Sequence, residues 1–190
     1  MRNSSCGKIT IAAQWFIFYA LVLLLVPIRW VLGWSLASLL HEFGHCIALK
    51  LCNVRIVEIR INIHGAQITA EPIPQAKEAI CALAGPAVGL CTLLVLRYAP
   101  YMALSGFIQS CFNLLPVYPL DGGRALRCFL LCYFNTHKTD LILQLISITM
   151  ILGFVAFGIW MSIKYALGAW PILFPAMSIL GVMWKNSLQR

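Results

Sequence analysis

The chain has 190 residues, of which 61% are hydrophobic and only 11% are charged. Soluble globular domains carry about 25% charged residues, so this composition excludes an ordinary soluble domain and indicates an integral membrane protein. The formal net charge of +8 does not indicate a nucleic-acid partner, because the basic residues lie mostly between apolar runs, where they act as topology signals.

Six apolar segments are predicted to span the membrane, since a helix needs about 20 apolar residues to cross the hydrocarbon. In chain order they cover 11–28, 30–52, 79–96, 98–120, 141–163 and 165–184. Between the second and the third, polar and apolar residues alternate strictly from Glu58 to His64, and "AQITAEP" follows Gly65. Period two predicts a strand, so a short β-hairpin is expected at the cytosolic interface or in a protein-lined cavity, because an open sheet edge cannot face lipid. The fold class is therefore an all-α polytopic membrane protein of about six helices with this hairpin between the second and third.

The distribution of basic residues favours cytosolic N- and C-termini. Of the 14 Lys and Arg residues, only Arg29, Arg97 and Lys164 then lie outside, and the remaining 11 lie inside, as the positive-inside rule requires. One domain, 1–190, is expected. We expect neither a PDZ nor a CBS domain, because the apolar segments take up nearly all of the length.

The run His41-Glu42-Phe43-Gly44-His45 lies inside the second apolar segment, where an ionisable residue is costly and marks function by default. On a helix, His41 and His45 share a face. Two imidazoles at that spacing can hold one Zn2+, with the glutamate beside the metal as general base. The alternative is a chance match whose histidines hydrogen-bond to their neighbours, and the position within a membrane segment disfavours it.

Two histidines and a catalytic water leave a zinc site one protein ligand short. Among the other acidic residues and histidines, only Asp121 lies at the end of a segment within a disrupted helix, "NLLPVYPLDGGR". Pro116 and Pro119 break the backbone hydrogen-bond ladder, and a broken helix is tolerated where it lines a water-filled cavity. Asp121 could instead form an Asp-Gly turn at the interface, but the HEFGH run favours a ligand. His64 is expected to lie outside the ligand set.

Three stretches together carry a resemblance to a known family. HEFGH, "ALAGPAVGL" at 82–90 and "NLLPVYPLDGG" at 113–123 resemble the motifs of the site-2 protease family of intramembrane zinc metalloproteases. The six segments, the PLDGGR run and the hairpin most resemble its sporulation factor IVFB-like branch from bacteria. Within the second stretch, Gly85 and Pro86 are interpreted as helix packing or a kink.

The resemblance implies one Zn2+ per chain, held by His41, His45 and Asp121. It also implies that Glu42 activates the attacking water and that Asn113 positions the substrate or stabilises the oxyanion. The implied activity is regulated intramembrane proteolysis: hydrolysis of peptide bonds in or near the transmembrane segments of membrane-associated protein substrates. The implied location is a bacterial cell membrane, with the active site opening towards the cytosol.

Other interpretations of the same residues stay open. One is a metal transporter that uses the intramembrane His and Asp residues as a relay, although transporters tend to show repeated halves and this sequence shows no repeat. Others are a non-proteolytic zinc-binding membrane protein and a CAAX-processing type of peptidase, against which the NxxPxxPLDGG pattern argues. The hairpin is expected either to pair with substrate along 57–64 or to cap the cytosolic mouth. A regulatory membrane protein and the oligomeric state are left open.

Overall fold

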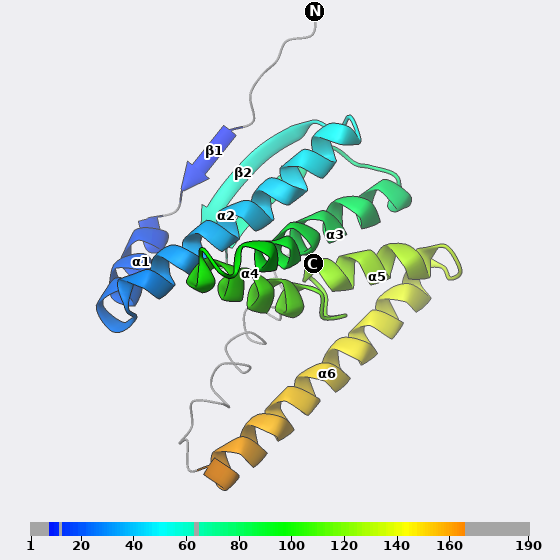
Figure 1. Ribbon diagram of the computed structural model, residues 1–190. Coiled ribbons are helices and arrows are strands. Elements are labelled where there is room, and N and C mark those ends of the chain that lie inside the picture. The colour runs from blue at the N-terminus through cyan, green and yellow to red at the C-terminus, as the bar shows by residue number, and fades with distance from the viewer. Residues whose placement is uncertain (1–7, 12, 63–64, 166–190) are drawn as a thin grey trace, which may run out of the picture. The chain divides into compact units, whose positions relative to one another are not determined.

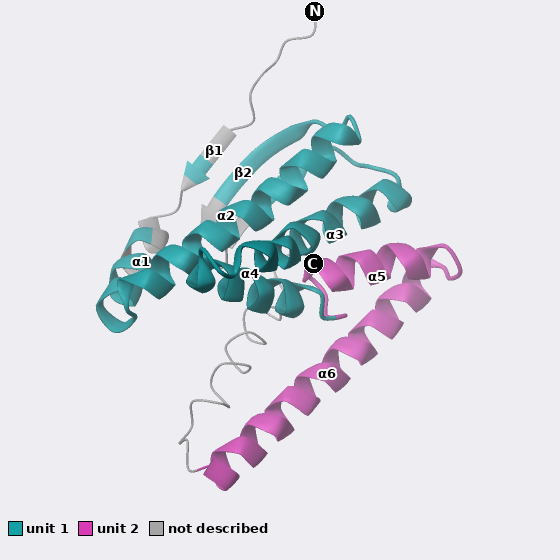
Figure 2. Cartoon of the chain, viewed as in Figure 1, with its two compact units in different colours: residues 1–115 teal, residues 116–190 magenta. Residues whose placement is uncertain are grey.

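The computed structural model describes residues 8–11, 13–62 and 65–165, and the chain divides into two compact units, 1–115 and 116–190 (Figure 1, Figure 2). The elements of the first unit are β1 (Lys8–Ile11), α1 (Ala13–Leu25), α2 (Ile28–Leu51), β2 (Ile56–Asn62), β3 (Gly65–Ala70), α3 (Gln75–Cys91), the 3-10 helix η1 (Thr92–Val95) and α4 (Pro100–Asn113). The elements of the second unit are α5 (Asp121–Leu131) and α6 (Thr136–Tyr165). The chain is thus mostly helical with one small sheet.

The sheet has three strands in the order β1-β2-β3. Strands β2 and β3 are antiparallel, with Ile59 opposite Ile68, which confirms the hairpin that the alternating residues predict. Strand β1 was not predicted, and it pairs in parallel with β2. Because β2 lies in the middle, its backbone is paired on both sides. The outer edges of the described sheet belong to β1 and β3. The alternative that substrate pairs along 57–64 therefore does not hold for 58–61, where β1 and β3 already take both sides of the strand.

Prolines and one left-handed residue set the helix boundaries of the first unit. Pro27 separates α1 from α2, because proline lacks the N–H that would continue a helix and restricts the residue before it. Helix α2 ends at Leu51, and the N–H of Val54 then bonds back to the carbonyl of Leu49. Asn53 makes this reversal at φ 56, a conformation that asparagine tolerates better than most residues.

The core of the first unit lies where the end of α2 and the start of α3 meet the sheet. Ala48, Leu49 and Cys81 are buried there, and Ile56 and Ile68 pack against them from β2 and β3. In Figure 1, β2 runs alongside α2 and α3 lies beside α2. The second half of α2, which carries the HEFGH run, is therefore held between a sheet and a helix.

The described helices only partly match the six predicted membrane segments. Two described stretches are long and apolar enough to cross a membrane, Gln75–Val95 and Thr136–Tyr165. Helix α2 has 24 residues but contains the polar HEFGH run. Helices α1 and α4 have 13 and 14 residues, fewer than the about 20 that a straight crossing needs. The sixth predicted segment, 165–184, lies outside the described residues except for its first residue.

Two of the predicted segments differ from the helices at their ends. The segment 11–28 is wrong at its start, because Ile11 ends strand β1 and the helix begins at Ala13. The segment 98–120 is helical only as far as Asn113. This break agrees with the disruption that the two prolines after Asn113 predict.

Candidate metal centre

The two histidines of the HEFGH run lie on the buried face of α2. The exposed fractions of His41 and His45 are 3% and 9%, whereas Glu42 is half-buried and Phe43 is exposed. The helical spacing brings the two rings edge to face, with their centroids 4.9 Å apart. Their Nε2 atoms are separated by 3.2 Å. The pair that the sequence predicted on one helix face is therefore formed inside the protein.

A backbone carbonyl fixes the orientation and the tautomer of His45. Its Nδ1 lies 2.7 Å from the carbonyl oxygen of Cys81 on α3. A carbonyl only accepts hydrogen bonds, so Nδ1 carries the hydrogen and donates it. In a neutral imidazole the other nitrogen, Nε2, then keeps its lone pair. This is the arrangement in which metal-binding histidines are commonly held.

A glycine on α3 makes room for the His45 ring. A Cβ atom at Gly85 would lie 2.6 Å from Cε1 of His45 and would overlap Nε2, so a larger residue cannot occupy this position without moving the ring. On α2, a Cβ at Gly44 would lie 2.8 Å from the carbonyl oxygen of Ala84. Gly44 and Gly85 thus let the two helices approach closely at the histidine pair.

The role of Gly85 was not predicted from the sequence, where Gly85 and Pro86 were interpreted as packing or a kink. Packing is part of what Gly85 does, since α2 and α3 meet there. The sequence did not reveal that the His45 ring lies directly against Gly85. The small residues of the "ALAGPAVGL" stretch were the available signal, because a stripe of small residues marks close helix contact.

Asn113 lies beside the histidine pair. It is the last residue of α4, and its Nδ2 is 3.5 Å from Nε2 of His41, at the limit of a hydrogen bond. The structure therefore brings together three of the five predicted site residues through their side chains: His41, His45 and Asn113. Glu42 lies on α2, between the two histidines in the sequence, and it is half-buried.

The geometry of the pair fits zinc. Two nitrogen ligands at about 2.0–2.1 Å from Zn2+ in a tetrahedral arrangement lie about 3.3 Å apart, close to the observed 3.2 Å between the Nε2 atoms. Because the Cys81 carbonyl accepts the hydrogen of Nδ1, the lone pair of His45 is on Nε2, the nitrogen that faces His41. Nitrogen donors of this kind suit zinc among the divalent metals.

Asp121 is the first residue of α5, a helix of the second unit (Figure 2). It is half-buried and directly follows the proline-containing segment 116–120. His64, which was expected to be outside the ligand set, lies outside the described residues.

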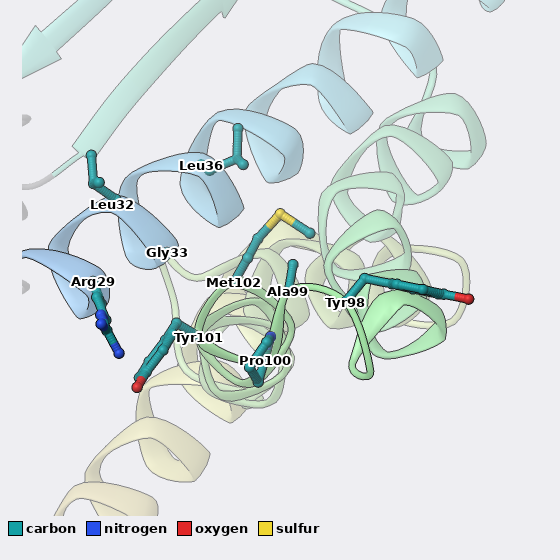
Figure 3. A pocket seen from close by; sticks show the side chains of 9 residues that line it. All are labelled: Arg29, Leu32, Gly33, Leu36, Tyr98, Ala99, Pro100, Tyr101 and Met102. Atoms are coloured by element: carbon teal, nitrogen blue, oxygen red, sulfur yellow. The ribbon is translucent and has the colours of Figure 1, made fainter.

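A separate hollow of about 400 Å³ lies at the other end of α2 (Figure 3). Its wall combines apolar residues of α2 and α4 with Arg29 and two tyrosines, Tyr98 and Tyr101. Figure 3 shows Arg29 and Tyr101 on the same side of the hollow and Tyr98 pointing away on the other side. None of the predicted site residues lines it.

Comparison with known proteins finds relatives in sequence and in fold. No protein-family model matches the chain. A protein named as a zinc metalloprotease of Methanocaldococcus jannaschii is 28% identical over 157 residues, covering 75% of this chain and 44% of the relative. Rip3 of Mycobacterium tuberculosis, named as a zinc metalloprotease candidate, is 32% identical over 130 residues, covering 54% of this chain and 33% of the relative. The chain thus spans less than half the length of the curated relatives it matches.

A solved structure shares the fold of nearly the whole chain. The site-2 protease from Methanocaldococcus jannaschii superposes with a TM-score of 0.68 at 24% sequence identity, covering 97% of this chain and 94% of that one. At this identity the likeness establishes the fold. The chain has the fold of a site-2 protease, and its sequence is similar to proteins named as zinc metalloproteases.

Proposed function

We propose that the protein is an intramembrane zinc metalloprotease of the site-2 protease type. The observation that carries the proposal is the histidine pair, with Nε2 atoms 3.2 Å apart and with His45 held by the Cys81 carbonyl. A pair of imidazoles packed this closely in a buried place needs a positive partner or a shared hydrogen, and zinc supplies the first. The relatives named as zinc metalloproteases and the shared fold support the same conclusion.

In this proposal one Zn2+ is held by His41, His45 and Asp121. When bound, zinc supplies Lewis-acid chemistry, polarising a carbonyl and acidifying water. The Glu42 carboxylate accepts the proton of the attacking water and returns it to the leaving amine. The Asn113 amide donates a hydrogen bond to the negative charge that develops on the carbonyl oxygen; its position 3.5 Å from His41 Nε2 supports this role.

The substrate in this proposal is a membrane-associated protein cut in or near its membrane segment, and the process is regulated intramembrane proteolysis. Both units form one catalytic domain, 1–190, which crosses the membrane several times with both termini in the cytosol of a bacterial cell. The two long apolar helices support a membrane location. An unwound substrate segment would pair with the outer edge of β3, since β2 is paired on both sides. Membership of the sporulation factor IVFB-like branch rests on the PLDGGR run and the hairpin.

Replacing Asp121 by asparagine tests the proposed ligand set. We expect the zinc affinity to fall by more than the roughly 10–100-fold that loss of an outer-shell partner costs, because the amide lacks the negative charge of the carboxylate. Zinc is measured by elemental analysis of the purified protein after dialysis against a chelator. The matched control is His137→Ala, since His137 is exposed at the start of α6, and this variant should keep its zinc.

Several outcomes would contradict the proposal. Zinc held equally by the wild type and by Asp121→Asn would remove Asp121 from the ligand set. The proposed protease activity would be overturned if the wild-type protein held no zinc, or if it held zinc but did not cut a reporter membrane segment. In the second case, uptake of zinc into liposomes containing the protein would favour the transporter interpretation.

A further inference from the structure

The segment before Asp121 forms a closed turn in the second unit. The N–H of Leu120 donates to the carbonyl of Val117 at 2.8 Å, and the N–H of Arg124 donates to the carbonyl of Leu120 at 2.9 Å. These two bonds join the turn to the first turn of α5, which begins at Asp121. The position of this turn therefore sets the position of the Asp121 backbone.

The first turn of α5 packs directly on this segment through a glycine. A Cβ at Gly123 would lie 2.5 Å from both the carbonyl carbon and the oxygen of Val117 and 2.6 Å from the nitrogen of Tyr118. Position 123 therefore has to be glycine for the turn to fold back on α5. This contact fixes the turn on one side only.

On its other side, the turn is held by α6. Pro116 and Pro119 have no N–H to donate, so the segment has few backbone donors with which to anchor itself. The N–H of Tyr118 donates to the hydroxyl oxygen of Ser147 at 3.3 Å. Ser147 lies in the middle of α6 and is only 9% exposed. The bond is partly buried, and a buried hydroxyl is stabilised by having a hydrogen-bond partner, so Ser147 supplies an acceptor that the proline-containing segment uses.

We infer that Ser147 is a positioning residue of the metal centre, acting through the backbone of Tyr118 on the carboxylate of Asp121. The inference rests on the proposed function, in which Asp121 binds zinc. The turn contacts Gly123 on one side and Ser147 on the other. These two contacts fix the position of Asp121, the residue at which α5 begins. Without the Ser147 hydroxyl, the turn loses its anchor on α6, and the Asp121 carboxylate is presented less precisely to the metal.

The α5–α6 pair has other contacts that keep it folded when the Ser147 hydroxyl is removed. Arg127 Nε on α5 donates to Asp140 Oδ1 on α6 at 3.0 Å. Cys128 and Thr139 are both buried on the same two helices. Loss of one hydroxyl should therefore change the position of the turn rather than unfold the unit.

The test compares Ser147→Ala with Ser147→Thr, which keeps the hydroxyl, in the full-length protein. We expect the zinc dissociation constant to rise about tenfold in Ser147→Ala, the lower end of the range for outer-shell partners, while the variant stays folded and still melts in one cooperative transition. Ser147→Thr should stay within about threefold of the wild type, a small part of that range. Hydrogen exchange of a peptide covering 117–120 should become roughly fivefold faster in Ser147→Ala, as expected for one lost hydrogen bond.

The matched control is Thr149→Val on the same helix. The Thr149 hydroxyl is exposed and donates to the carbonyl of Leu145 within α6, so its loss should change neither zinc affinity nor exchange of the turn. If Ser147→Ala is poorly folded, Ser147→Cys replaces only the oxygen by sulfur, a weaker acceptor, and should also lose zinc affinity. Zinc binding by the wild type with equal affinity in Ser147→Ala and Ser147→Cys would overturn the positioning role alone. A wild type without zinc would overturn the proposed function as well.

Discussion

Replacing Glu42 by glutamine should reduce cleavage of a membrane reporter by about 10²- to 10⁴-fold, the contribution of a general base. Glutamine has nearly the same shape but cannot accept a proton from water. Glu42 is not one of the proposed ligands, and it follows His41 on the same helix. The zinc content should therefore stay at the wild-type level. Both quantities are measured on the same detergent-purified samples, cleavage by gel and zinc by elemental analysis.

Glu71→Gln is the control for this experiment. Glu71 is exposed on the segment between β3 and α3, and its replacement makes the same change of charge away from the histidine pair. It should leave both cleavage and zinc content unchanged. If Glu42→Gln cuts the reporter as fast as the wild type, then Glu42 is not the general base.

Replacing Gly85 by alanine should lower the zinc affinity by at least about 100-fold, the upper end of what outer-shell changes cost. The new methyl group would overlap His45 Nε2 and would lie 2.6 Å from Cε1. The ring must then turn away, which breaks the bond from Nδ1 to the Cys81 carbonyl. Overpacking of this kind also costs about 1–3 kcal/mol of folding stability, so the melting temperature is measured together with zinc retention.

Gly153→Ala separates the steric effect from the general effect of adding a methyl group to a helical glycine. Gly153 lies inside α6, and among the described residues a Cβ there would meet no heavy atom within 4 Å apart from the neighbouring backbone of its own helix. Alanine is a better helix former than glycine by about 1 kcal/mol, so this variant should be at least as stable as the wild type and should keep its zinc. Tight zinc binding by Gly85→Ala would mean that His45 is not a ligand in the observed orientation.

Features that depend on neighbouring residues in the chain could be predicted from the sequence. The spacing of His41 and His45 places them on one helix face whatever surrounds the helix, and the alternation after Glu58 indicates a strand. The end of α4 at Asn113 follows from the prolines after it, because proline cannot continue the ladder. The roles of Glu42, Asn113 and Asp121 stay predictions.

Features that depend on residues distant in the chain were missed. Strand β1 is only four residues long, and it exists because β2 lies beside it, 45 residues or more further along. No local pattern distinguishes such a strand from the start of an apolar helix. In the same way, Gly85 looks like any packing glycine until the fold places His45 against it.

The pairing of β1 with β2 constrains how the chain can cross a membrane. Hydrogen-bonded strands lie at one level, so Ile11 and Ile61, which are partners in the parallel pair, are on the same side of any bilayer. Parallel strands need a long crossover between them, and here α1 and α2 form it. The chain between these strands therefore crosses an even number of times, either twice or not at all. If α2 crosses the bilayer with its histidine pair, the segment that contains α1 must make the opposite crossing.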